Sequence, residues 1–129
     1  MRFRVQKLIR DGLPQMMRDQ GLQVFERRLE NDGEFIAALK EKLVEEAAEA
    51  RDAGPDELVA ELADVLEVVH ALARAAGLSL EEIETARETK RLARGGFDER
   101  VFNAAVEAAD GSPAAEYYLA RPGQYPRED

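Results

Sequence analysis

Residues 43–69 read LVEEAAEARDAGPDELVAELADVLEVV and decide the fold. Two segments with helical apolar spacing flank Gly54 and Pro55, the strongest turn signal in the stretch. Because residues three or four apart share one face of a helix, the acidic residues of each segment are stacked together. The stretch therefore predicts a helical hairpin with a group of carboxylates on each helix. These carboxylates are Glu45, Glu46, Glu49, Glu61 and Asp64.

The two acidic groups lie at similar distances from the turn. Glu46 is eight residues before Gly54 and Glu61 is seven after it, so at about 1.5 Å per residue each lies roughly 10–12 Å along its helix. Antiparallel helices would bring both groups to one height. Glu46 and Glu61 also fall at the edges of their apolar stripes, where an unpaired charge is destabilising. A divalent cation with oxygen ligands, Mg²⁺ above all, would neutralise the group.

Three long amphipathic helices are predicted. The first begins around residues 31–33 and ends near residue 53, and the second has Pro55 in its first turn and ends at Gly77. The third begins at a capping box formed by Ser79 and Glu82 and ends before residues 95–96, which are both glycine. An all-α fold follows from these three helices.

Shorter elements are expected around the long helices. Residues 2–6 and 22–29 are interpreted as one or two short N-terminal strands, with a short helix near residues 11–21 between them. A further short helix is expected around residues 101–109. Residues 111–129 are rich in Pro and Gly and are interpreted as an extended C-terminal tail that packs against the rest of the chain.

The apolar surface of the second long helix is wider than one stripe. Val68 lies about 120° from Leu62 at ~100° per residue, on the side that carries the acids. Three such helices do not cover one another well in a monomer, so we expect a bundle completed by oligomerisation, as a homodimer or homotetramer. The predicted stripe consists of Leu58, Leu62, Val65, Leu66, Val69 and Leu72.

Composition limits the cellular setting and the partners. The 129 residues predict a single domain, 1–129, with its core at about residues 5–102. The absence of cysteine excludes disulfides and thiolate catalysis and fits a cytoplasmic protein. No apolar run reaches the ~20 residues of a spanning helix, and there is no signal-peptide pattern, so no membrane partner is expected. Residues 41–67 carry ten acidic residues against two basic ones, which disfavours nucleic acid as a partner.

The acidic residues fit the pattern E-E-x-x-E followed by E-x-x-D, which resembles the hallmark of the MazG-like members of the all-α nucleoside triphosphate pyrophosphohydrolase superfamily. Three further segments are similar to a short subgroup often labelled phosphoribosyl-ATP pyrophosphohydrolase-like. They are KLIRDGLP at residues 7–14, ELADVLEVVHAL at residues 61–72 and KRLARGGFDERVF at residues 90–102. Together these matches span roughly residues 5–102.

This resemblance implies a helical bundle of the all-α pyrophosphatase type that oligomerises. It also implies Mg²⁺-dependent hydrolysis, with Mn²⁺ as a substitute ion, of a nucleoside triphosphate to the monophosphate and pyrophosphate. By motif position the metal ligands would be Glu45, Glu46, Glu49, Glu61 and Asp64. Glu45 and Glu46 are also the residues expected to be catalytic.

Cations would have to supply the phosphate contacts, because the sequence has no Gly-rich phosphate loop. Lys90 and Arg94 lie one turn apart and are expected to bind phosphate, as are Lys7 and Arg10. Two alternatives stay open. Lys90 and Arg94 could instead complement the dipole of their helix, and Arg10 could form an ion pair with Asp11.

Several functions remain open at this point. The first expectation is housekeeping of non-standard or surplus nucleotides, because histidine-biosynthesis enzymes of the superfamily generally lack a KLIRDGLP-type opening. The alternative substrate is phosphoribosyl-ATP. The subgroup usually has a basic residue where this chain has Gly12, which weakens a phosphate role for the opening segment. A non-catalytic helical dimerisation module is a further alternative. A di-iron site at Glu67 and His70 is disfavoured because His70 is the only histidine.

Overall fold

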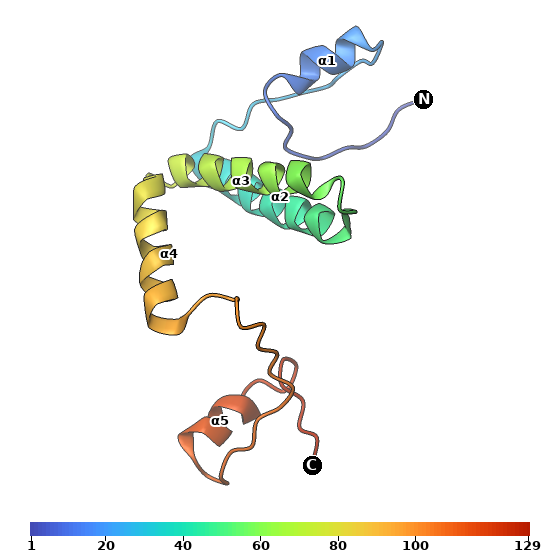
Figure 1. Ribbon diagram of the computed structural model, residues 1–129. Coiled ribbons are helices and arrows are strands. Elements are labelled where there is room, and N and C mark those ends of the chain that lie inside the picture. Colours follow the sequence, from blue (N-terminus) through green and yellow to red (C-terminus); the bar gives the residue numbers. More distant parts are fainter. The chain divides into compact units, whose positions relative to one another are not determined.

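The computed structural model describes residues 1–129 and contains five helices and no strand. The predicted all-α fold class is therefore confirmed. Residues Met1–Ala93 form one compact unit and Arg94–Asp129 form a second. None of the helices combines the length and the apolar character needed to cross a bilayer. The helices are α1 (Leu13–Asp19), α2 (Asp32–Asp52), α3 (Leu58–Ala75), α4 (Leu80–Arg94) and α5 (Pro113–Leu119) (Figure 1).

Helix α2 begins where its sequence provides a cap. The Asn31 side chain accepts a hydrogen bond from the backbone N–H of Glu34 at 2.9 Å, which satisfies one of the free amide groups of the first turn. Asp32 and Glu34 place negative charge at the positive end of the helix dipole. The observed span agrees with the predicted helix from residues 31–33 to about residue 53.

Helix α3 begins at Leu58, three residues after Pro55, which was predicted to lie in its first turn. The backbone N–H of Glu57 donates to the carbonyl of Gly54 at 3.0 Å, so Pro55 occupies the second position of a four-residue turn, where its fixed φ is favourable. At the other end of α3, Gly77 has φ 72°. Its left-handed backbone lets the N–H of Leu78 donate to the carbonyl of Ala73 at 2.8 Å and end the helix.

Helices α2 and α3 lie side by side and form the packed centre of the first unit (Figure 1). The buried apolar residues of this hairpin are Leu39 on α2, with Val68 and Ala73 on α3. Glu46 is 7% exposed and is the buried charged residue. Because Glu46 follows Leu39 by seven residues, two helical turns, both side chains point from α2 toward α3. A carboxylate is thus part of the core.

The face that α3 turns toward α2 differs from the predicted stripe. Val68, which lay outside that stripe and was expected to extend the surface for a second copy, is buried at 7% exposure. Within the predicted stripe, Val65, Val69 and Leu72 are half-buried, whereas Leu62 and Leu66 are 53% and 56% exposed. The cause is the row of Glu61, Asp64 and Val68, which shares one helical face and packs toward α2. This packing leaves a row of three leucines exposed, here called the leucine row: Leu58, Leu62 and Leu66.

Helix α4 is capped as its sequence predicted. The backbone N–H of Glu82 donates to Ser79 Oγ at 3.0 Å, and the backbone N–H of Ser79 donates to Glu82 Oε1 at 3.3 Å. This reciprocal pair is the capping box. The helix ends at Arg94, immediately before Gly95 with φ 83°. No residue of α4 is buried.

The N-terminal strands are absent, so that prediction was wrong. Residues 2–6 and 22–29 have no regular secondary structure. A strand needs a neighbouring backbone to pair with, and the chain offers none for either segment. The segment after α1 is held instead by Arg18, whose guanidinium contacts the carbonyl of Val24 at 3.5 Å and Glu26 Oε1 at 2.5 Å.

In the second unit the helix lies later than predicted. Residues 101–109 contain no helix, and α5 lies within the segment that was expected to be extended. Ser112 Oγ accepts from the N–H of Ala115 at 3.1 Å, and Pro113 occupies the first turn, so this sequence favours a helix start. The three tyrosines pack against one another, with ring centroids 4.9–6.2 Å apart.

The α2 cap provides a test of the fold. We expect Asn31→Ala to lower the free energy of unfolding by about 1 kcal/mol, because the N–H of Glu34 loses its acceptor. In thermal unfolding followed by circular dichroism, this should lower Tm by about 4 °C. The matched control is Asn103→Ala, at an exposed position outside the helices. Equal Tm values for the two variants would contradict the assigned cap.

Candidate metal centre

Three of the five predicted carboxylates come together across the helical hairpin. Glu46 on α2 and Glu61 and Asp64 on α3 each offer one oxygen, and these oxygens all lie within 4.8 Å of one another. Here we call these three residues the acidic triad. The triad forms because both helices present acids at the same distance from the connecting turn.

Two oxygens of the acidic triad lack a partner. Glu46 Oε2 and Glu61 Oε2 are buried and have no hydrogen-bond partner. Leaving a buried acceptor unsatisfied destabilises a fold by about 1–3 kcal/mol, and the proximity of a second carboxylate adds repulsion. A hard divalent cation would satisfy both oxygens, since Mg²⁺ and Mn²⁺ prefer carboxylate ligands. The residues present therefore fit the ion that the sequence predicted.

Lys42 provides the positive charge that contacts Glu46. Its ammonium group lies 3.1 Å from Glu46 Oε1 and 3.4 Å from Glu45 Oε2, and its side chain is 18% exposed. Partial burial pushes the pKa of Lys42 down, but its contacts with the two glutamates outweigh burial and raise that pKa. Lys42 was not among the predicted site residues. Its spacing of three and four residues from two predicted ligands is the signal that could have found it.

The N-terminal segment brings two further cations to the carboxylates. Lys7 Nζ lies 3.2 Å from Glu45 Oε1, and Arg10 Nη2 lies 2.7 Å from Asp64 Oδ1. Arg10 thus pairs with a residue 54 positions away instead of with the adjacent Asp11. Both residues were predicted to bind phosphate, and the structure places them beside the acids that would hold the metal.

The two remaining predicted ligands lie outside the acidic triad. Burial pushes the pKa of Glu45 up, but the Lys7 and Lys42 ammonium groups outweigh this effect and lower that pKa. Glu49 is exposed, and hydrogen bonding and charge repulsion from Glu46 raise its pKa. Glu45 is therefore held by protein cations, whereas Glu49 shares the negative potential of its neighbours.

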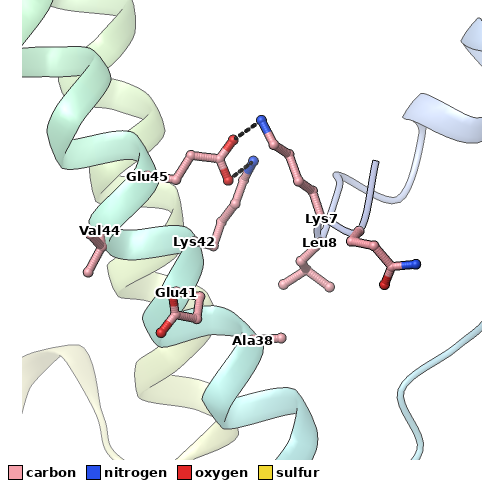
Figure 2. Close-up of a pocket in the computed structure, with 8 residues that line it drawn as sticks. Lys7, Leu8, Ala38, Glu41, Lys42, Val44 and Glu45 are labelled. Carbon is pink, nitrogen blue, oxygen red and sulfur yellow. Dashed lines mark ion pairs between the residues drawn. The ribbon is translucent and has the colours of Figure 1, made fainter. Parts of the chain in front are cut away.

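A cleft adjoins the carboxylates on the side of the N-terminal segment. It measures about 420 Å³ and lies between residues 6–8 and one face of α2, within the size range of small-molecule sites. Figure 2 shows the Lys7 and Lys42 ammonium groups converging on Glu45 at its edge. Leu8 and Ala38 give it an apolar wall. Cationic and apolar groups thus lie around Glu45, and the residues of the acidic triad are not part of the cleft lining.

The other predicted functional residues lie elsewhere. Lys90 is exposed on α4 and does not contact the acidic triad, and Arg94 is the last residue of α4. Their phosphate-binding role stays a prediction, beside the alternative that they complement the helix dipole. The acidic triad includes neither Glu67 nor His70.

Replacing the buried carboxylate tests the centre without any substrate. We expect Glu46→Gln to change the stability of the metal-free protein little, because the loss of repulsion from Glu61 is offset by the loss of the ion pair with Lys42. Wild type should gain about 2.7 kcal/mol at a Mg²⁺ concentration of about 100 times Kd, and the variant should gain almost nothing. Thermal unfolding with Mg²⁺ and with EDTA measures both effects.

The matched control for this substitution is Glu41→Gln, at an exposed position of the same helix. It should keep the Mg²⁺-dependent rise in Tm. A Glu46→Gln variant that is less stable than wild type without metal, yet equally stabilised by Mg²⁺, would contradict a metal centre at this position.

Comparison with known families agrees with this geometry. The profile of the phosphoribosyl-ATP pyrophosphohydrolase family matches residues 13–91, which include the whole acidic triad. No curated protein and no solved structure gives a significant match. The match covers more than half of the chain, so the activity class is that of a pyrophosphohydrolase acting on phosphorus-containing acid anhydrides. The chain belongs to the phosphoribosyl-ATP pyrophosphohydrolase family, within the MazG-like all-α nucleoside triphosphate pyrophosphatase superfamily.

Proposed function

We propose that this protein is a Mg²⁺-dependent hydrolase that cleaves a nucleoside triphosphate between the α and β phosphates, releasing the monophosphate and pyrophosphate. Mn²⁺ would substitute for Mg²⁺. The observation that carries this proposal is the pair of buried, unpartnered oxygens of Glu46 and Glu61 beside Asp64. Family membership supports cleavage of a pyrophosphate bond.

The carboxylates divide into two groups in this proposal. The acidic triad would hold the ion, and Glu49, one turn beyond Glu46, is exposed. When bound, the divalent cation polarises phosphate oxygens and neutralises their charge. Glu45, with both oxygens on ammonium groups, holds Lys7 at the edge of the cleft.

Lys7 and Arg10 would contact the substrate phosphates. Their side chains are 54% and 55% exposed in the ion pairs that they form with Glu45 and Asp64. Exposed ion pairs contribute about 0–1 kcal/mol, so exchanging a carboxylate for a phosphate loses little. Lys90 and Arg94 complete the set of cations proposed to bind phosphate.

Two substrates remain under this mechanism. The KLIRDGLP opening favours housekeeping of non-standard or surplus nucleotides. The family match favours phosphoribosyl-ATP, whose cleaved bond is also a pyrophosphate linkage. Both substrates present a polyphosphate to the same carboxylates, so the base and sugar contacts must distinguish them.

Pyrophosphate release from standard and modified nucleoside triphosphates, and from phosphoribosyl-ATP, tests the activity and identifies the substrate. Wild type should release pyrophosphate with Mg²⁺ and not with EDTA. Glu46→Gln should lower kcat/KM by at least about 100-fold, because transition-state stabilisation by the ion is lost. Glu107→Gln, at an exposed position outside the helices, should retain wild-type rates. No release from any compound, with no effect of Mg²⁺ on Tm, would leave the helical dimerisation module as the better explanation.

We also propose that the protein is a homodimer or homotetramer. Leu58, Leu62 and Leu66 form one row on α3 and are 40%, 53% and 56% exposed, and the adjacent Val59 is 80% exposed. A contiguous apolar row of this kind is typical of an interaction surface. A second copy of the chain would cover it by helix packing.

The leucine row provides the test of assembly. The double variant Leu62→Gln with Leu66→Gln should weaken self-association by at least about tenfold, which corresponds to about 1.4 kcal/mol. Light scattering coupled to size-exclusion chromatography over a concentration series measures this change. Ala60→Gln, an exposed position outside the row, is the matched control. A wild-type chain that stays monomeric throughout the series would disprove the assembly.

A further inference from the structure

The two carboxylate oxygens of Glu46 lie in different environments, because only one of them contacts Lys42. Its ammonium group lies 3.1 Å from Oε1, while Oε2 is buried and has no partner. The contact of Oε1 with Lys42 therefore restricts the rotation of the Glu46 carboxylate and, with it, the position of Oε2. Among the cations beside the carboxylates, Lys42 is the only one that contacts Glu46.

The surroundings of Lys42 favour a fixed position. Its side chain is 18% exposed, against 54% for Lys7 and 55% for Arg10. It contacts Glu45 as well as Glu46, both within one helical turn on α2. An ammonium group between two anions on its own helix needs no distant segment to hold it in place.

Two opposite effects on a divalent cation follow from this geometry. As a positive charge close to a ligand, Lys42 repels the ion and lowers its affinity. As an outer partner, it fixes the orientation of a ligating carboxylate, which raises the affinity. The two effects have opposite signs when Lys42 is removed, so a binding measurement shows which of them is larger.

We propose that Lys42 is a positioning residue for the metal centre. Its ammonium group holds Glu46 Oε1, so that Oε2 faces Glu61 and Asp64 and the divalent cation binds more tightly. This inference rests on the metal-dependent function proposed above.

The test measures Mn²⁺ binding to the full-length protein by titration calorimetry, without nucleotide. Lys42→Met retains most of the apolar stem but removes the ammonium group, and it should weaken Mn²⁺ binding by about 10–100-fold. Lys40→Met, on the same helix at an exposed position, should stay within about twofold of wild type, the difference expected from remote charge. Unchanged or tighter binding in Lys42→Met would overturn the proposal.

A second variant and a second readout keep the test decisive. If Lys42→Met loses its helical circular dichroism, Lys42→Gln is measured instead, and binding as tight as wild type would again overturn the proposal. A structural role alone would lower the Tm of the metal-free protein and leave Kd for Mn²⁺ unchanged. If wild type itself binds no Mn²⁺, the proposed function fails, whereas normal wild-type binding that Lys42→Met retains removes only the positioning role.

Discussion

Repulsion among carboxylates on two packed helices is the constraint on which the first unit depends. Five acidic side chains lie close together in sequence on α2 and α3, three of them meet across the hairpin, and Glu46 is inside the core. Three cations, Lys7, Arg10 and Lys42, lie among them. Two negative charges are left uncompensated, which equals the charge of one divalent cation. Binding of one divalent cation, as proposed above, would balance these charges.

The apolar core of the hairpin is small, so bound ligands would contribute a large share of its stability. Leu39, Val68 and Ala73 are its buried apolar residues, and they lie alongside a charged residue instead of excluding it. Any ligand that binds the folded state alone stabilises it by mass action. Under the proposals made above, metal binding to the acidic triad and covering of the leucine row on α3 would therefore both add to stability.

The candidate metal ligands lie inside the range that matches the family, whereas the two N-terminal cations proposed to bind phosphate lie outside it. Residues 13–91 match the family and contain the acids that would hold the metal. Lys7 and Arg10 precede that range, yet they contact Glu45 and Asp64. The choice between a nucleoside triphosphate and phosphoribosyl-ATP depends on groups that meet the base and sugar. The cleft beside Leu8 lies next to these cations and is the first place to look for those groups.

The sequence by itself determined the all-α class, the span of α2 and the capping box of α4, because these features depend on interactions within a few residues. It also placed Glu46 and Glu61 at matching distances from the turn. Only the tertiary structure decided which face of α3 packs on α2, since Val68 and Leu62 are equally apolar in the sequence. It likewise decided the ion pair of Arg10 with Asp64. Such choices depend on contacts between segments far apart in the chain, and local periodicity carries no information about them.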